Sequence, residues 1–256
     1  MTAKEDSQAI LRLVEEESGK PVIVESDSSF SGHATLKIAG PDGPAHVLRY
    51  KPEFESELPY LIAFQCGLAL RTIRCRGENR FDLASTPRLA TDVQRLVNDH
   101  LRQAGGTIPS QLIPQLCNQF ASGLGLQLRS MPVAIRVDDW LLSSYPSLDQ
   151  LQRTSIERQL QEAMQSLGPN VKAIAPKMII DANASMSTAF AKFWAKTWGD
   201  PTVAVPFISA GYNAIGDELL SLVDSIDATP DGDRALVDAW AKRLELDGWF
   251  QTINKQ

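Results

Sequence analysis

The segment that most constrains the fold is the uncharged run over residues 58–70. If this run forms a helix, apolar side chains point to every side of it, and such a helix has to lie inside a domain. The run is too short to cross a bilayer, which takes about 20 apolar residues. Arg71, Arg74 and Arg76 mark its end. We therefore expect a central buried helix over residues 57–70.

The composition is that of an ordinary globular chain. It has 256 residues, 43% of them hydrophobic and 22% charged, which is long enough to bury a sizeable core. The net charge of −6 argues against nucleic-acid binding, because phosphate contacts need a basic surface. The N-terminus lacks a signal-peptide core, and the three cysteines have no short paired spacing. We expect a cytoplasmic protein with free thiols, no cofactor and no membrane contact.

Hydrophobic periodicity predicts the order of the elements. A helix over residues 5–18 precedes a strand at 21–25, and a hairpin follows with strands at 34–39 and 46–50. After the central helix comes a polar connection over 77–86, then helices over 87–104 and about 109–123. Four further helical stripes lie within 148–167, 186–198, 215–226 and 236–244.

These elements predict an α+β fold. A small sheet with a central buried helix forms an N-terminal domain over residues 1–130. A helical region over residues 131–256 follows, with the candidate boundary at Ser130-Met131-Pro132.

The five residues at the middle of the central helix are Phe64-Gln65-Cys66-Gly67-Leu68. Together with the preceding helix and strands, they resemble the zincin-type metallopeptidases. In that family short strands end in an edge strand, and the buried helix that follows carries His-Glu-x-x-His, whose histidines bind zinc while the glutamate activates water. The resemblance covers residues 5–104, and Gly67 matches the form of the motif with glycine before the second histidine.

The departures from that motif carry the functional prediction. Phe64 and Leu68 cannot bind zinc, and Gln65 cannot act as a general base. The resemblance therefore implies a degenerate metallopeptidase scaffold without metal or catalytic residues, which keeps a peptide-binding groove. The alternative is a core helix in an unrelated fold.

Other residues offer weaker chemistry. His33 and His46 could approach each other across the hairpin and, with Asp42, form a metal site. A simpler interpretation is that they are polar residues beside turns. Cys66 lies among apolar side chains and is expected to be inert, whereas the arginines around Cys75 favour its thiolate. Asp138-Asp139 could cap a helix as easily as bind a cation.

Arginine is concentrated between residues 71 and 102, where seven arginines stand against four acidic residues. Arg88, Arg95 and Arg102 recur every seven residues, so they share one side of a helix. Together with Arg71 and Arg74 they are a candidate patch for an anion or a partner. The simpler interpretation is a helix C-terminus complemented by Arg71 and Arg74, and a solvated, ion-paired face for the others.

We expect a non-catalytic protein-binding, scaffolding or regulatory protein whose partner is another protein or a second copy. The strand edge at 46–50 is the predicted place for an added peptide strand. Two alternatives stay open. One is an enzyme that uses Cys75 or clustered acidic residues, and the other is a nucleic-acid-associated regulator that uses the arginine face.

Overall fold

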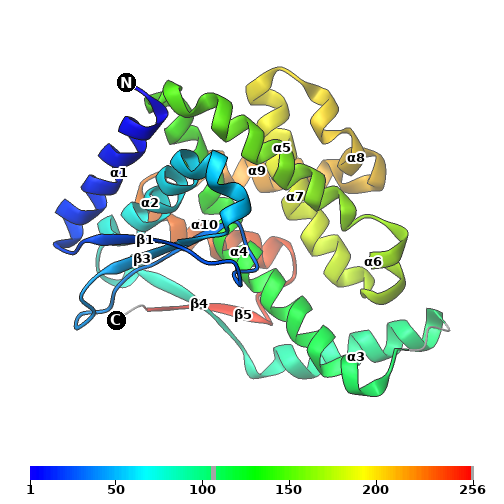
Figure 1. Cartoon of the computed structure of the whole chain (residues 1–256). Helices are drawn as coiled ribbons and strands as arrows, with labels where there is room; N and C mark the ends of the chain where they lie inside the picture. Colours follow the sequence, from blue (N-terminus) through cyan, green and yellow to red (C-terminus); the bar gives the residue numbers. More distant parts are fainter. Residues whose placement is uncertain (105–107, 255–256) are drawn as a thin grey trace. The chain divides into compact units, whose positions relative to one another are not determined.

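The computed structural model describes residues 1–104 and 108–254. Its contacts divide the chain into two compact units. Unit 1 comprises Met1–Arg76 with Arg136–Arg158, and unit 2 comprises Gly77–Ile135 with Gln159–Gln256. Helices α4 (Ile113–Ser144) and α5 (Asp149–Gln165) each contribute residues to both units. Figure 1 shows the order of the elements along the chain.

Unit 1 begins with helix α1 (Ala3–Ser18), which has well-formed ends. Thr2 and Glu5 form a capping box, in which the Thr2 side chain accepts from the Glu5 N–H and Glu5 accepts from the Thr2 N–H. Gly19 ends the helix in the left-handed conformation, with φ of +70°. The apolar stripe of Ile10, Leu11 and Val14 is buried.

The sheet of unit 1 has three strands: β1 (Val22–Ser26), β2 (Ala34–Lys37) and β3 (His46–Tyr50). The strand order is β1-β3-β2, with β1 parallel and β2 antiparallel to β3. The predicted hairpin of β2 and β3 is therefore confirmed. The prediction that residues 46–50 form an edge is wrong, because β1 pairs with the other side of β3. The two edges of the sheet are β1 and β2.

Helix α2 (Leu58–Arg74) follows β3 and is the predicted central helix. It packs on α1 and contacts β2 and β3. Eight of its residues are buried, among them Tyr60, Cys66 and Leu70. The second half of α4 completes this core, because Val137 and Trp140 lie against Gly67. An extra methyl group at Gly67 would have no room in this contact.

Unit 2 is mainly helical. It holds α3 (Pro87–Ala104) and the first half of α4, and the buried helix α7 (Lys177–Trp198) packs on α9. The close approach of α7 and α9 requires a glycine, since a Cβ at Gly216 would lie 2.6 Å from Thr188 Cγ2. The remaining helices are α6 (Pro169–Ile174), α8 (Val205–Phe207), α9 (Asn213–Ser225) and α10 (Asp233–Arg243).

A two-stranded ribbon in unit 2 differs from the sequence prediction. Strand β4 (Phe81–Ser85) pairs antiparallel with β5 (Phe250–Asn254). Residues 77–86 were expected to be a polar connection, and the second half of the chain was expected to be helical throughout. The two strands are far apart in sequence, so no local turn signal links them.

The predicted fold class is confirmed: the protein is α+β, with a small N-terminal mixed sheet and a largely helical remainder. The candidate boundary at Ser130-Met131-Pro132 falls inside α4, which continues through Pro132. The division into domains 1–130 and 131–256 stays a prediction.

Candidate functional site

The three positions of the degenerate motif lie on one side of α2, half-buried. The Phe64 ring packs on Tyr60, with 5.8 Å between the ring centroids, and Leu68 lies one turn further on. Gln65 faces strand β2 through its amide. Its Nε2 donates to the Ala34 carbonyl at 3.1 Å, and its Oε1 accepts from the Leu36 N–H at 3.2 Å.

These two bonds close the outer edge of β2. Because the Lys51 N–H bonds to the His33 carbonyl, the alternation of the ladder turns Thr35 and Lys37 toward β3 and turns Ala34 and Leu36 outward. The Gln65 amide thus supplies one donor and one acceptor to residues i and i+2, as a residue of a neighbouring strand would. A peptide that approached β2 at this point would first have to displace Gln65.

The outer edge of β1 is open beyond its first residue. The bond from the His46 N–H to the Pro21 carbonyl fixes the register, which turns Val22, Val24 and Ser26 outward. Glu15 accepts the Val22 N–H at 2.8 Å. Within the described residues, no donor or acceptor reaches the N–H or C=O of Val24. The strand is also exposed on its faces, with Ile23 48% and Val24 37% accessible.

The glycine that matches the metallopeptidase motif has a packing role in this chain. A Cβ at Gly67 would lie 2.6 Å from Val137 Cγ1 and 3.3 Å from Trp140 Cζ3. Glycine at this position therefore lets α2 and α4 approach closely, whatever the ancestry of the segment.

Two of the three histidines, His33 and His46, make packing or hydrogen-bond contacts within unit 1. His46 is buried, its Nδ1 accepts from the Ala39 N–H at 2.9 Å, and its Nε2 lies 2.8 Å from Ser18 Oγ. Because Nδ1 accepts, the hydrogen of the neutral ring is on Nε2, which donates to Ser18. The His33 ring packs on Phe54, with 4.2 Å between the centroids. No group of three or more His, Cys, Asp or Glu side chains in the described chain is arranged to hold a metal ion.

The environment of His46 predicts a pH-dependent loss of stability. Burial, followed by the nearby Lys20 charge, lowers the pKa of His46 below its usual 6.5. The unfolded chain therefore binds the proton more readily than the folded one. The contribution of His46 is complete above about pH 6.5 and is lost as the pH falls below that value. We expect the difference in unfolding free energy between the wild type and His46→Asn to shrink from pH 7.5 to pH 5. A difference independent of pH would contradict this assignment.

The cysteines divide by burial. Cys66 is buried among apolar side chains, as predicted, and burial raises the pKa of its thiol to about 12, which disfavours the thiolate. Burial also raises the pKa of Cys117 in unit 2. Cys75 is half-buried at the C-terminal end of α2, where its N–H bonds to the Arg71 carbonyl. A reactive role for Cys75 stays a prediction.

The five candidate arginines belong to both units. In unit 1, Arg74 forms a bidentate pair with Glu17 of α1, and Arg71 lies in the last turn of α2. In unit 2, Arg88, Arg95 and Arg102 are each more than two thirds exposed and pair with Asp92 or Asp99 on their own helix. Such exposed pairs contribute little to stability. A single anion patch formed by all five arginines stays a prediction.

One polar cluster in unit 1 was not expected from the sequence. Asp138 is fully buried in the middle of α4, so it neither caps a helix nor lies on the surface. Its Oδ1 accepts from Tyr60 Oη and from Gln152 Nε2, each at 2.9 Å. Burial raises the pKa of Asp138 to about 7, against the lowering effect of these two bonds. Only the tertiary fold brings these three side chains together.

Comparison with protein-family models, with curated proteins and with solved structures finds no match to this chain. Among the described residues, none of the helices is both long enough and apolar enough to span a membrane.

Proposed function

We propose that this chain is a non-catalytic protein-binding protein, and that unit 1 takes up an extended segment of a partner as a further strand on β1. The observation that carries the proposal is Val24, whose N–H and C=O point outward at an exposed strand edge. Natural sheets usually protect such edges, because an open edge pairs with other chains. An edge that is open while the opposite edge is closed is consistent with use by a partner.

The groups available on β1 define the binding mode. Glu15 occupies the Val22 N–H, which leaves the Val22 C=O, both groups of Val24 and the Ser26 N–H for an added strand. Ile23 and Val24 point to opposite faces of the sheet and are both accessible. The partner segment should therefore carry apolar side chains on both faces opposite these positions.

The resemblance to zincin-type metallopeptidases supports the non-catalytic part of the proposal. Unit 1 has the expected order of a helix, short strands and a buried helix, although its last strand is central and not at an edge. Phe64, Gln65 and Leu68 offer neither zinc ligands nor a general base. On this proposal, unit 1 keeps strand addition as a means of holding peptide and has lost hydrolysis.

The proposal is tested by removing one outward N–H. Extended peptides that bind the whole 256-residue chain are selected from a displayed library, and their affinities are measured by fluorescence polarisation. Val24→Pro removes only a donor that faces solvent, since the bonds to β3 come from residues 23 and 25. We expect it to weaken peptide binding at least tenfold, equivalent to about 1.4 kcal/mol.

The matched control is Val24→Thr, which keeps the N–H and the β-branched shape and should bind within about twofold of the wild type, because β-branched side chains suit strands similarly. Amide hydrogen exchange reports whether each variant keeps the β1–β3 pairing. Selection of no extended peptide, or equal binding by Val24→Pro with its sheet intact, would count against strand addition.

A further inference from the structure

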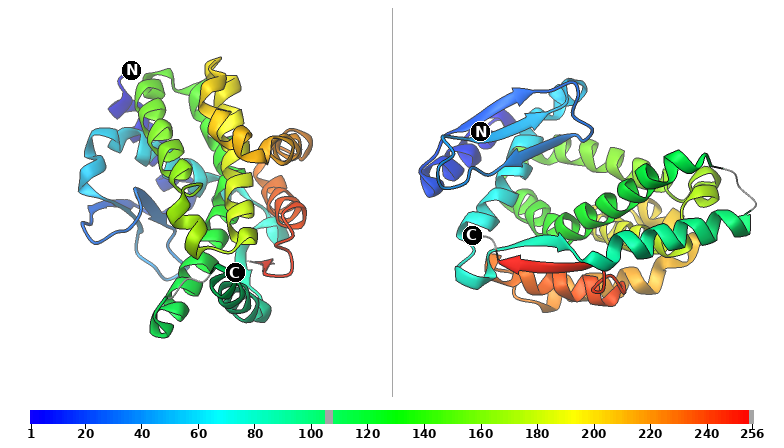
Figure 2. Two further views of the ribbon diagram at one scale, coloured as in Figure 1. Left: turned by 90° about the vertical axis from the view of Figure 1, so that its right-hand side faces the viewer. Right: turned by 90° about the horizontal axis from the view of Figure 1, so that it is seen from below.

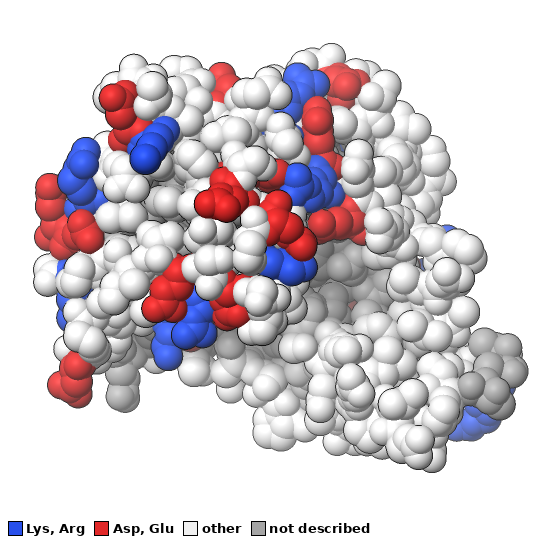
Figure 3. Space-filling model, in the orientation of Figure 1, with Lys and Arg blue, Asp and Glu red and all other residues white. Residues whose placement is uncertain are grey.

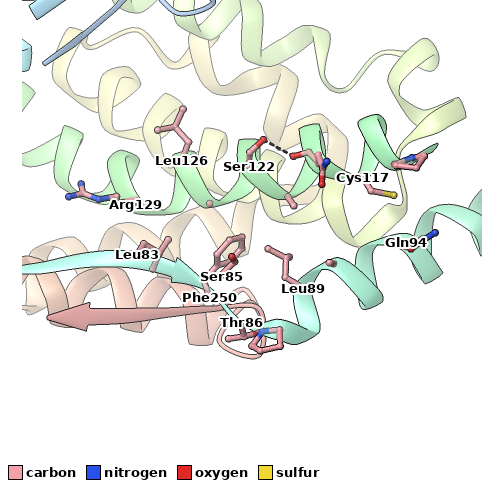
Figure 4. A pocket seen from close by; sticks show the side chains of 16 residues that line it. Leu83, Ser85, Thr86, Leu89, Gln94, Cys117, Ser122, Leu126, Arg129 and Phe250 are labelled. Atoms are coloured by element: carbon pink, nitrogen blue, oxygen red, sulfur yellow. Dashed lines mark hydrogen bonds between the residues drawn. The ribbon is translucent and has the colours of Figure 1, made fainter. Parts of the chain in front are cut away.

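A long groove lies within unit 2, between α3 and the first half of α4. Its volume is about 760 Å³, and Leu83 of β4, Leu89 of α3 and Phe250 of β5 supply much of its apolar lining. Figure 4 shows α4 along one side of the groove, with α3 and the β4–β5 ribbon along the other. Figure 2 shows α3 and this part of α4 running in opposite directions.

The wall formed by α4 carries small side chains, which would let the backbone of a docked helix approach closely. Small side chains line it at successive turns, namely Cys117, Ala121, Ser122 and Gly125. Leu126 lies among them with 70% of its surface accessible. Because Pro114 and Arg129 also line the groove, this wall is about 22 Å long at 1.5 Å per residue. That length matches about four turns of a docked helix.

The groove lies in a region with a small excess of positive charge. On α3 three arginines stand against two aspartates, and Arg129 is the one charged side chain among the described residues that line the groove. Residues 100–137 contain no aspartate or glutamate, although the whole chain carries a net charge of −6. Arg129 lines one end of the groove, where its Nε bonds to Asp82 at 2.8 Å. On α3, Gln94 lines the groove, and Arg95 is the next residue, turned about 100° away around the helix. The row of Arg88, Arg95 and Arg102 therefore lies on the side of α3 next to its groove-lining face.

These three arginines are accessible to a partner. Their ion-pair partners on α3 are Asp92 and Asp99, and all three arginine side chains remain largely exposed. Figure 3 shows the region of α3 and early α4 as mostly uncharged, with blue atoms near the end of α3. An occupant with acidic residues along one flank would therefore gain favourable contacts at this rim.

We infer that this groove binds an amphipathic helix of a partner protein, with small and apolar residues on the buried face and acidic residues along the flank that meets α3. Helix-in-groove recognition combines an apolar stripe with charged flanks in this way. The inference does not rest on strand addition at β1, which involves different residues of the other unit. Val24→Pro should leave groove binding unchanged, so the two proposals can fail separately.

The test uses helical peptides of about 16 residues, which are selected from a displayed library for binding to the whole 256-residue chain, with the flanking positions free to vary. A selected peptide is then made in three versions that carry Glu, Gln or Lys at its flank, and each is measured by fluorescence anisotropy. We expect the Glu version to bind at least tenfold more tightly than the Lys version, with a difference that shrinks as salt is raised.

Two sets of variants locate the site. Ser122→Trp fills the groove and should weaken binding at least tenfold, whereas Gln119→Trp, on an exposed side of α4 outside the groove, should change it less than twofold. Arg95→Glu combined with Arg102→Glu should reverse the order of the Glu and Lys peptides. Selection of no helical peptide, indifference to Ser122→Trp, or a charge preference that survives the double reversal would each overturn the inference.

Discussion

We expect the replacement of Asp138 with asparagine to stabilise the protein at alkaline pH. The pKa of Asp138 is raised from 3.8 to about 7 in the fold, so the folded state holds this proton more tightly than the unfolded chain does. Stability is therefore lost as the pH rises from about 4 to 7, and the loss is complete above pH 7. This rise in the pKa of Asp138, from 3.8 to about 7, corresponds to a loss of about 4 kcal/mol in the free energy of unfolding at pH 8. Asparagine stays neutral and avoids this cost.

Urea unfolding of the wild type and Asp138→Asn at several pH values checks the prediction. The advantage of the variant should grow by about 3 kcal/mol between pH 5 and pH 8, because the unfolded carboxyl is already largely ionised at pH 5 and part of the cost is present there. Asp139→Asn is the matched control, since it removes one exposed carboxylate from the next position of the same helix. If the two variants showed the same pH dependence, the burial of Asp138 would not be the cause.

We expect Gly67→Val to destabilise unit 1 by about 3 kcal/mol, because it overpacks a close helix contact. The added Cβ alone would lie 2.6 Å from Val137 Cγ1. Val137→Ala removes that methyl group together with Cγ2, and it should recover part of the loss. The loss of unfolding free energy in the double variant should then be smaller than the sum of the losses in the two single variants. Chemical denaturation of all four proteins measures this difference as a double-mutant cycle.

A second glycine separates this packing effect from helix propensity. Gly123 lies in α4, and a Cβ added there would meet no atom within 4 Å, so Gly123→Ala should stabilise by up to about 1 kcal/mol. Gly67→Ala makes the same change of residue and should instead destabilise. If both alanine variants stabilised the protein equally, the α2–α4 contact at Gly67 would be looser than described.

Local pattern was sufficient for most of the fold. The uncharged run of α2, the turn-flanked hairpin and the apolar stripe of α3 each depend on nearby residues, and each was predicted from the sequence. The pairing of β4 with β5 was not, because Phe81 and Asn254 are brought together only by the fold of unit 2. The central place of β3 was missed for the same reason. β1 and β3 are neighbours in the sheet, although β2 lies between them in the sequence.

The candidate sites show the same division. The chemical identity of Phe64 and Leu68 is enough to exclude zinc ligation at these two positions, and that of Gln65 is enough to exclude a general base. Their sequence says nothing about Ala34 and Leu36, the residues that Gln65 bonds. Likewise Asp138 gave no signal of burial, because its neighbour Asp139 is exposed and a pair of acids suggests a surface. Burial of a single polar residue on an otherwise apolar helix face depends on tertiary contacts.

The Gln65 amide also limits what this position can become. It donates to one backbone group of β2 and accepts from another, and a carboxylate at neutral pH can only accept. A glutamate at position 65 would therefore face the Ala34 carbonyl without a proton to offer. The two bonds to β2 require an amide at position 65, whereas activation of a water molecule requires a carboxylate. A glutamate introduced at this position would therefore open the outer edge of β2 that Gln65 now closes.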